Sequence, residues 1–155
     1  MLINKSGDLL KATENIICHQ CNTEGIFGGG LAYQIKGLYP NCEISAINHV
    51  KNIKTLTGKR EVVGTYNAYP IDIDKTIVNC FTQDKNFNTN HDAIETVFSS
   101  ILEYCQFYKK TIAIPYKYGC GIAHGNWDEV SKIFEKLSNK YDVDISVYRK
   151  ENINE

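Results

Sequence analysis

Two glycine-rich segments carry the clearest chemistry in this sequence. Gly25 to Gly30 (GIFGGG) and Gly119 to Gly125 (GCGIAHG) lie about ninety residues apart, and each follows a strand-like apolar run and opens into a helix-like segment. Because glycine has no Cβ, backbone N–H groups in such loops can converge on an anion, and the N-terminus of the following helix adds about half a positive charge. Two such loops facing each other would suit a diphosphate.

Other nucleotide and metal motifs are missing from the sequence. The first loop lacks the glycine spacing of a dinucleotide-binding fingerprint, and neither loop contains the Gly-Lys-Ser/Thr of a P-loop. Cys18 and Cys21 have the two-residue spacing of a zinc or redox site, but no second Cys/His pair follows at ligand spacing. We therefore expect neither a metal nor another cofactor.

The elements that must position these loops alternate between strands and helices. Apolar runs predict strands, and apolar residues three or four apart predict helices. The expected strands are Asn15–Cys18, Lys59–Tyr66, Thr76–Phe81, Thr111–Ile114 and Val143–Tyr148, with a turn-rich connection over Asn67–Lys75. The expected helices are Gly30–Leu38, which stops at Pro40, then Asn90–Phe107 and Trp127–Leu137. This order predicts a mostly parallel sheet covered on both faces, with ligands outside the carboxyl ends of its strands.

Length and composition fit one globular domain. The chain has 155 residues, of which 43% are apolar and 23% charged, enough to bury a core without cross-links. We expect a single domain over residues 1–149 and a polar tail over 150–155. The six cysteines are expected to be free thiols, since the first twenty residues contain no secretory segment.

Charge and hydropathy bear on partners and location. The formal net charge of −1 provides no basic field for nucleic acid, so we expect no nucleic-acid partner. Residues 1–20 carry polar or charged side chains every few positions, so no membrane span is expected there. We expect a soluble, cytoplasmic monomer.

Three motifs together resemble the macro domain, a family that binds ADP-ribose. They are Lys5 to Leu10 (KSGDLL), Cys18 to Tyr33 (CHQCNTEGIFGGGLAY) and Ile114 to Trp127 (IPYKYGCGIAHGNW), and the resemblance covers nearly the whole chain. It implies an α/β fold of three αβα layers with a mixed, mostly parallel central sheet. The partner it implies is ADP-ribose or an ADP-ribose derivative.

Within that family, the chain is most similar to the branch of the yeast-type ADP-ribose 1″-phosphate phosphatases and the terminal ADP-ribose protein glycohydrolases. That branch shares His/Cys-x-Cys-Asn followed by Gly-Gly-Gly-Ile/Leu-Ala-Tyr-Gln. The glycohydrolases use a lysine and an aspartate, whereas the matching positions here are Gln83 and Ala123. The phosphatase-like members resemble this chain at His19, which would act as a general acid or base or orient a water. Asn22, Thr82 and Gln83 would complete the site as hydrogen-bond donors.

The resemblance also implies the residues that bind the ligand. Asp8 would accept a hydrogen bond from the adenine 6-amino group, and the alternative for Asp8 is a helix or turn cap. Gly7 and Leu9 would also bind the ligand, Leu9 through a backbone N–H beside Asp8. The other implied contacts are Gly28, Gly29, Gly30 and Leu31 for the distal ribose; Gly119, Cys120, Gly121, Ile122 and Ala123 for the diphosphate; His124 in the same loop; and Tyr148 beside the adenine ring.

The function that these expectations favour is hydrolysis at the distal ribose, with ADP-ribose 1″-phosphate as the leading substrate. One alternative is a non-catalytic reader of ADP-ribose, which the loss of the lysine and aspartate favours. The other is an ADP-ribosyl hydrolase that removes ADP-ribose from protein or nucleic acid.

Overall fold

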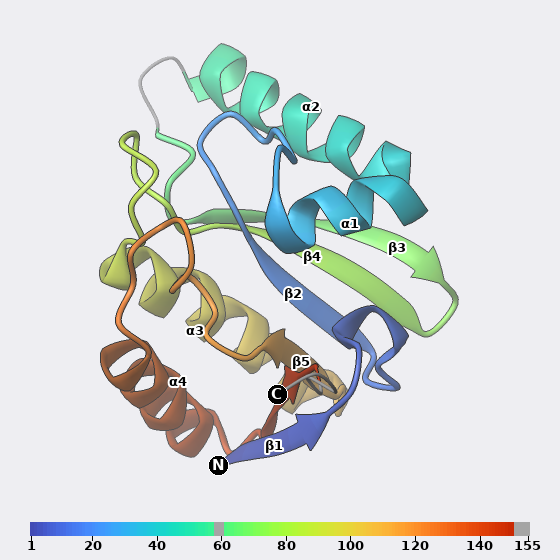
Figure 1. Cartoon of the computed structure of the whole chain (residues 1–155), viewed down its shortest axis with the longest axis vertical. Helices are drawn as coiled ribbons and strands as arrows, with labels where there is room; N and C mark the ends of the chain where they lie inside the picture. Colours follow the sequence, from blue (N-terminus) through green and yellow to red (C-terminus); the bar gives the residue numbers. More distant parts are fainter. Residues whose placement is uncertain (58–60, 151–155) are drawn as a thin grey trace.

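The computed structural model describes residues 1–57 and 61–150, and Figure 1 shows them arranged in three layers. Residues Lys59 and Arg60, at the start of one expected strand, and most of the expected tail lie outside this part. The elements are, in order, β1 (Leu2–Ser6), the 3₁₀ turn η1 (Leu9–Lys11), β2 (Ile16–Cys21), α1 (Gly30–Leu38), α2 (Pro40–Thr57), β3 (Thr65–Asp72), β4 (Lys75–Phe81), α3 (His91–Tyr108), β5 (Ile112–Pro115), α4 (Trp127–Tyr141) and β6 (Ile145–Arg149).

A mixed sheet forms the middle layer. In the described part of the chain it has six strands in the order β1-β6-β5-β2-β4-β3. Only the edge strand β3 runs antiparallel to its neighbour, β4, and the other four pairings are parallel. Helices α1 and α2 cover one face and α3 and α4 the other (Figure 1). The expected three-layer α/β fold with a mostly parallel sheet is therefore confirmed.

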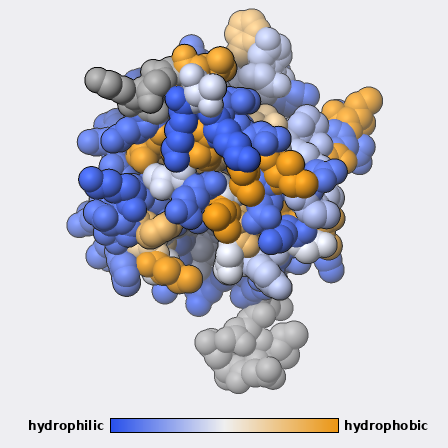
Figure 2. All heavy atoms as spheres, turned by 90° about the horizontal axis from the view of Figure 1, so that it is seen from above, coloured by the Kyte–Doolittle hydropathy of each residue, from blue (hydrophilic) through white to orange (hydrophobic). Residues whose placement is uncertain are grey.

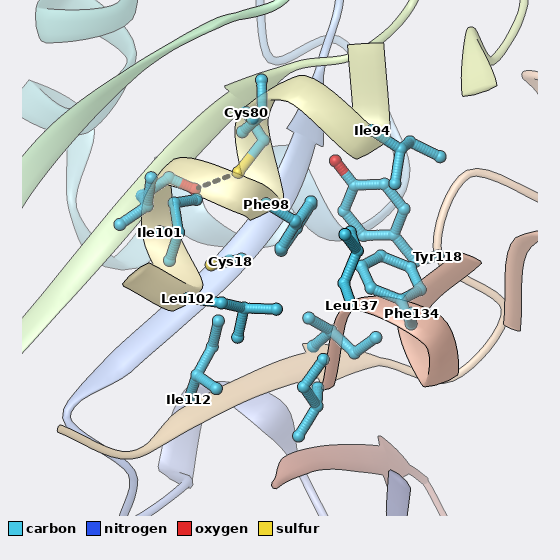
Figure 3. Packing of buried hydrophobic residues seen from close by; sticks show 14 of the residues in the cluster. Cys18, Cys80, Ile94, Phe98, Ile101, Leu102, Ile112, Tyr118, Phe134 and Leu137 are labelled. Atoms are coloured by element: carbon cyan, nitrogen blue, oxygen red, sulfur yellow. Dashed lines mark hydrogen bonds between the residues drawn. The ribbon is translucent and has the colours of Figure 1, made fainter. Parts of the chain in front are cut away.

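The core between the sheet and α3 and α4 is built around aromatic side chains. Phe98 of α3 makes T-shaped contacts with Tyr118 and Phe134, whose ring centroids lie 5.5 and 4.7 Å away. Figure 3 shows these rings beside aliphatic residues of α3, α4 and β5. Tyr118 is 1% exposed, although it belongs to the segment that follows β5. The burial of Tyr118 in this core thus fixes the segment that follows β5.

The opposite core, under α1 and α2, is smaller. Cys42, Ala46 and Val50 lie four residues apart on α2 and are buried against Phe27, Ile35 and the sheet. These buried side chains are small, and the rest of α2 is rich in asparagine and lysine. The apolar signal of this helix is therefore weak, which is why the sequence analysis did not predict it. Pro40 begins α2, where a proline costs no hydrogen bond.

The expected strand at Lys59–Tyr66 is wrong in its placement. Gly64 has a φ of 88° and Thr65 donates its N–H to the carbonyl of Val62, so the described residues before β3 form a turn. The strand instead covers most of the stretch Asn67–Lys75, which we expected to be turn-rich. Its exposure alternates along its length, and its Pro70 is tolerated because β3 is an edge strand.

The remaining expected elements are present with small shifts of their ends. All six cysteines lie within the described residues as free thiols. Within the same residues, no helix combines the length and the hydropathy needed to span a membrane. Figure 2 shows one face of the molecule, on which hydrophobic residues are scattered among hydrophilic ones.

Candidate functional site

The first glycine loop lies between the carboxyl end of β2 and the N-terminus of α1. Asn22 shapes it: its Oδ1 accepts from the N–H groups of Glu24 and Ile26, and its Nδ2 donates to the Ile26 carbonyl. Gly29 caps α1 without a side-chain hydrogen bond, and Gly30 has a φ of 58°. The first N–H groups of α1 therefore receive no side-chain cap from Gly29, which suits an anion at this helix end.

The second glycine loop is tightly packed at its base. A Cβ on Gly119 would lie 2.7 Å from Thr89 Oγ1, and one on Gly125 would lie 2.3 Å from the Gly119 carbonyl oxygen. Glycine is thus required at both positions by close contact. The N–H of Cys120 donates to the Lys117 carbonyl at 2.9 Å. This N–H is thus used within the loop, and the predicted role of Cys120 as a diphosphate donor would require it to leave the Lys117 carbonyl.

The tip of this loop faces the solvent. Ile122 is 83% exposed and Gly121 is exposed, while Ala123 is buried. His124 is exposed and adopts a left-handed conformation with a φ of 60°. Its N–H donates to the Gly121 carbonyl, which bends the loop.

The two loops face each other across a cleft. One cavity of about 340 Å³ is lined by residues of both loops and of the ends of β2 and β4: His19, Gln20, Gly29, Gly30, Leu31, Ala32, Gln83, Pro115, Tyr116, Lys117, Tyr118, Gly119, Gly121, Ile122 and Ala123. A second cavity of about 250 Å³ shares several of these residues and adds Cys21, Asn22, Ile26, Gly28 and Phe87. The structure thus brings together most of the residues predicted for the distal ribose and the diphosphate.

The floor of the cleft is a network of uncharged groups. Gln83 Nε2 donates to Gln20 Oε1 at 3.0 Å, and Gln20 Nε2 donates to Thr82 Oγ1 at 3.0 Å. The Thr82 hydroxyl lies 2.6 Å from the hydroxyl of Tyr118 and is fully buried. Thr82, which was predicted to donate to the ligand, uses its hydroxyl to link the floor to the core through Tyr118. Thr89 donates to the Gly119 carbonyl and ties the second loop to the same network.

His19 lies on β2, and its environment differs from the one expected for a general acid. Its side chain is 1% exposed, its Nε2 lies 2.6 Å from Asn79 Oδ1, and its Nδ1 has no hydrogen-bond partner among the described residues. Burial lowers the pKa of His19 to about 4, and the contact with Asn79 only partly opposes this. The ring is therefore neutral at neutral pH, and the expectation of a general acid there is contradicted. An unprotonated nitrogen remains available as an acceptor.

The predicted adenine end lies beyond these two cavities. Asp8 Oδ1 accepts from the N–H of Leu10 at 3.0 Å, so the capping role considered as the alternative is present. Gly7 has a φ of 139°, and a Cβ there would lie 3.9 Å from the ring of Tyr148. Leu9 is buried in a small cluster against which the Tyr148 ring packs. These residues do lie together, although neither cavity includes them.

A buried carboxylate anchors this end. Glu14 is 4% exposed and accepts from the Tyr148 hydroxyl at 2.5 Å and from Lys5 Nζ at 2.7 Å. Although burial would raise its pKa, hydrogen bonds from Lys5, Tyr148 and Ser146 lower the pKa of Glu14 to about 2. Its charge therefore fixes the orientation of the Tyr148 ring.

Sequence reasoning missed several of these residues. Glu14, Asn79 and Thr89 lie outside the three motifs, and Gln20 and Tyr118 lie within motifs without an expected role. The roles of all five follow from contacts between distant segments. The position of Gln20 could have signalled it, since this polar residue follows His19 at the end of an otherwise buried strand. Among the described residues, no group of three or more His, Cys, Asp or Glu side chains could hold a metal ion.

Comparisons with known proteins agree with this arrangement. The macrodomains of Thermus aquaticus DarG and Mycobacterium tuberculosis DarG superpose with TM-scores of 0.76 and 0.77, at 22% and 23% identity. Each comparison covers 96% of this chain, and 98% and 97% of the respective relatives.

A structure described as Thermosipho africanus DarTG in complex with ADP-ribose gives a TM-score of 0.77 at 18% identity, covering 99% of this chain and 43% of that one. A comparison with curated proteins finds no match. The macro domain family model matches residues 18–134, which include both glycine loops and most of the sheet. The chain therefore belongs to the macro domain family.

Proposed function

We propose that this chain binds ADP-ribose or a derivative in the cleft and acts as a hydrolase at the distal ribose, with ADP-ribose 1″-phosphate as the leading substrate. One observation carries the proposal: the second glycine loop and the N-terminus of α1 line the same cavity. Backbone N–H groups and a helix N-terminus suit a diphosphate. The adjoining cavity beside Asn22 and Gly28 would then take the distal ribose and its phosphate.

Phosphate release in this site would depend on a neutral acceptor. His19 lines the cleft, and its free Nδ1 could accept a proton from a water that attacks phosphorus. The bond between phosphorus and the ribose oxygen then breaks, and the imidazolium returns the proton to that oxygen, which leaves as a hydroxyl. Gln83 would donate to a phosphate oxygen from the other side of the floor. Such a mechanism uses the unprotonated imidazole, which the low pKa of His19 favours.

A non-catalytic reader is the second candidate, and the floor of the cleft favours it. Gln20 and Gln83 are uncharged, Ala123 carries no functional group, and His19 is nearly inaccessible. Binding alone requires the two loops and no titratable group. An ADP-ribosyl hydrolase is less favoured. Gln83 stands where the resembling glycohydrolases have a lysine, and Lys85, two residues further on, is exposed and belongs to neither cavity.

Two measurements separate these candidates. Calorimetric titration with ADP-ribose tests binding, and release of inorganic phosphate from ADP-ribose 1″-phosphate tests catalysis. For the phosphatase, His19→Ala should lower the turnover at least about 100-fold, as loss of a general base does, while ADP-ribose still binds. The matched control is His91→Ala, at the start of α3.

The outcomes are distinct. Binding by the wild-type protein without phosphate release would support the reader, whereas absence of ADP-ribose binding would contradict the proposed function altogether. Because His19 is buried, circular dichroism and thermal unfolding must first show that His19→Ala is folded.

A further inference from the structure

We propose that Asn79 is a positioning residue that holds His19 in the Nε2–H tautomer, so that Nδ1 acts as a hydrogen-bond acceptor for an O–H donor in the cleft. The donor would be a hydroxyl of the distal ribose or a water bound beside it. This inference rests on the proposed function for the identity of the ligand. Its statement about the tautomer can be tested without any ligand.

Asn79 and His19 are direct neighbours across two parallel strands. They are paired in the register of β2 and β4, and both are buried. Asn79 Nδ2 donates to Asn67 Oδ1 at 3.0 Å, and Asn67 Nδ2 in turn donates to Ser45 Oγ at 2.8 Å. The amide of Asn79 is therefore anchored from β3 and α2. Its oxygen is the atom that faces His19, at 2.6 Å from Nε2.

A second contact supports this orientation of the Asn79 amide. The thiol of Cys42 on α2 donates to Asn79 Oδ1 at 3.4 Å. If the amide were turned over, its NH₂ group would face the imidazole and the thiol would lose its acceptor. The imidazole would then need its proton on Nδ1, and a buried N–H would be left unpaired, which is rarer in proteins than an unpaired acceptor. Nε2 is thus the protonated nitrogen.

Nδ1 is the atom left for a ligand. It is buried, and no described residue of the protein bonds to it. A buried polar atom without a partner is costly, so a ligand that supplies one gains affinity. His19 lines the cavity next to Gly30 and Leu31, at the N-terminus of α1. An unprotonated nitrogen accepts a hydrogen bond from a hydroxyl or a water but offers nothing to a fully ionised phosphate oxygen, which has no proton to donate.

Nitrogen NMR of the ring tests the inference directly. In ¹⁵N-labelled wild-type protein at pH 7, long-range ¹H–¹⁵N spectra should show His19 with a protonated Nε2 and an unprotonated Nδ1. The His19 signals are assigned by their loss in the spectrum of His19→Gln. Saturation with ADP-ribose should move the Nδ1 resonance upfield, as acceptance of a hydrogen bond requires.

ADP identifies the donor because it lacks the distal ribose. A shift with ADP-ribose alone assigns the donor to a ribose hydroxyl, and a shift with both ligands assigns it to a bound water. A protonated Nδ1 in the free protein would overturn the inference, as would an unmoved Nδ1 resonance when calorimetry shows that ADP-ribose is bound. If calorimetry shows no binding, the proposed function fails, while the tautomer of the free protein still decides the role of Asn79.

Asn79→Ala tests the positioning role. Without the amide oxygen, the ring should populate the Nδ1–H tautomer, and the affinity for ADP-ribose should fall about tenfold, the loss of one hydrogen bond to a buried group. Asn52→Ala, on the outer side of α2, is the matched control and should leave both the spectrum and the affinity unchanged. An unaltered His19 spectrum in folded Asn79→Ala would contradict the inference.

Discussion

Uncharged hydrogen-bonding side chains dominate the floor of the cleft, and a charged cluster lies beyond it, where the adenine ring is predicted to bind. Gln20, Gln83 and neutral His19 form the floor, whereas ionised Glu14 lies behind Tyr148. A floor of this kind can discriminate ligands by the direction of their hydrogen bonds. The charged cluster instead fixes the aromatic ring of Tyr148 through its hydroxyl.

Asp8 caps the turn at Leu9–Lys11 and is predicted to bind adenine, and two substitutions distinguish the cap from the predicted contact. Asp8→Asn keeps a good capping side chain but replaces the charged acceptor, so the dissociation constant for ADP-ribose should rise about tenfold with little change in stability. Asp8→Ala should show the same loss of affinity and also destabilise the fold by about 0.5–1 kcal/mol. Calorimetry and urea unfolding measure the two effects. Unchanged affinity in both variants would mean that Asp8 is only a cap.

Glu14 should make the stability of the protein depend on pH. Its pKa is lowered to about 2 in the folded state from an ordinary value of 4.5, so its carboxylate stabilises the fold above pH 4.5. This contribution is lost as the pH falls through 2, because the folded state must then take up a proton. Glu14→Gln lacks it.

The wild-type protein should therefore be more stable than Glu14→Gln by about 2 kcal/mol at pH 6, and the difference should shrink between pH 4.5 and 2. The magnitude allows for solvent screening of the partly exposed Lys5. Urea unfolding at a series of pH values measures the difference. A gap that does not change with pH would show that packing, and not the charge, accounts for the effect.

At the scale of elements, the sequence predicted best where the chain carries strong local signals. The helix Gly30–Leu38 and the strand Thr76–Phe81 have clear apolar periods and were placed to within a residue. Helix α2 escaped prediction because its buried residues Cys42, Ala46 and Val50 are small or isolated among polar ones. Strand β3 was misplaced because an edge strand tolerates the asparagine and proline that also signal turns.

The residues of the site also divide into those that local sequence signals reveal and those that they do not. Motifs identified both glycine loops, whose local backbone demands determine the residue type. They could not identify Thr89 or Tyr118, because these act by touching Gly119 and Thr82, which lie far from them in sequence. Nor could a motif reveal that His19 is buried, since that depends on α1 and on Phe27, whose ring lies 5.1 Å from the imidazole.

The second glycine loop offers a test at this scale. Gly119→Ala should destabilise the protein by about 2 kcal/mol, because its φ is 70° and its Cβ would meet Thr89 Oγ1 at 2.7 Å. Gly121→Ala is the matched control: no described heavy atom lies within 4 Å of its Cβ, so stability should change by less than about 0.5 kcal/mol. Thermal unfolding compares the two. Equal losses would contradict the packing seen at the base of the loop.

At the scale of the whole molecule, the sheet is what unites the two halves of the cleft. The glycine loops are about ninety residues apart in sequence, yet they follow β2 and β5, which are neighbours in the strand order. Parallel pairing brings the carboxyl ends of both strands to the same edge. A ligand held by both loops must therefore stabilise contacts that span most of the chain.

ADP-ribose should accordingly protect both loops at once. At a concentration one hundred times its dissociation constant it should stabilise the fold by about 2.7 kcal/mol and raise the melting temperature by about 5–10 °C. Hydrogen exchange, followed by mass spectrometry, should slow in peptides covering Gly25–Gly30 and Gly119–Gly125 together, and ADP should protect the first of these less because it lacks the distal ribose. Protection confined to one loop would contradict a shared diphosphate site, since a ligand bound to a single loop leaves the exchange of the other unchanged.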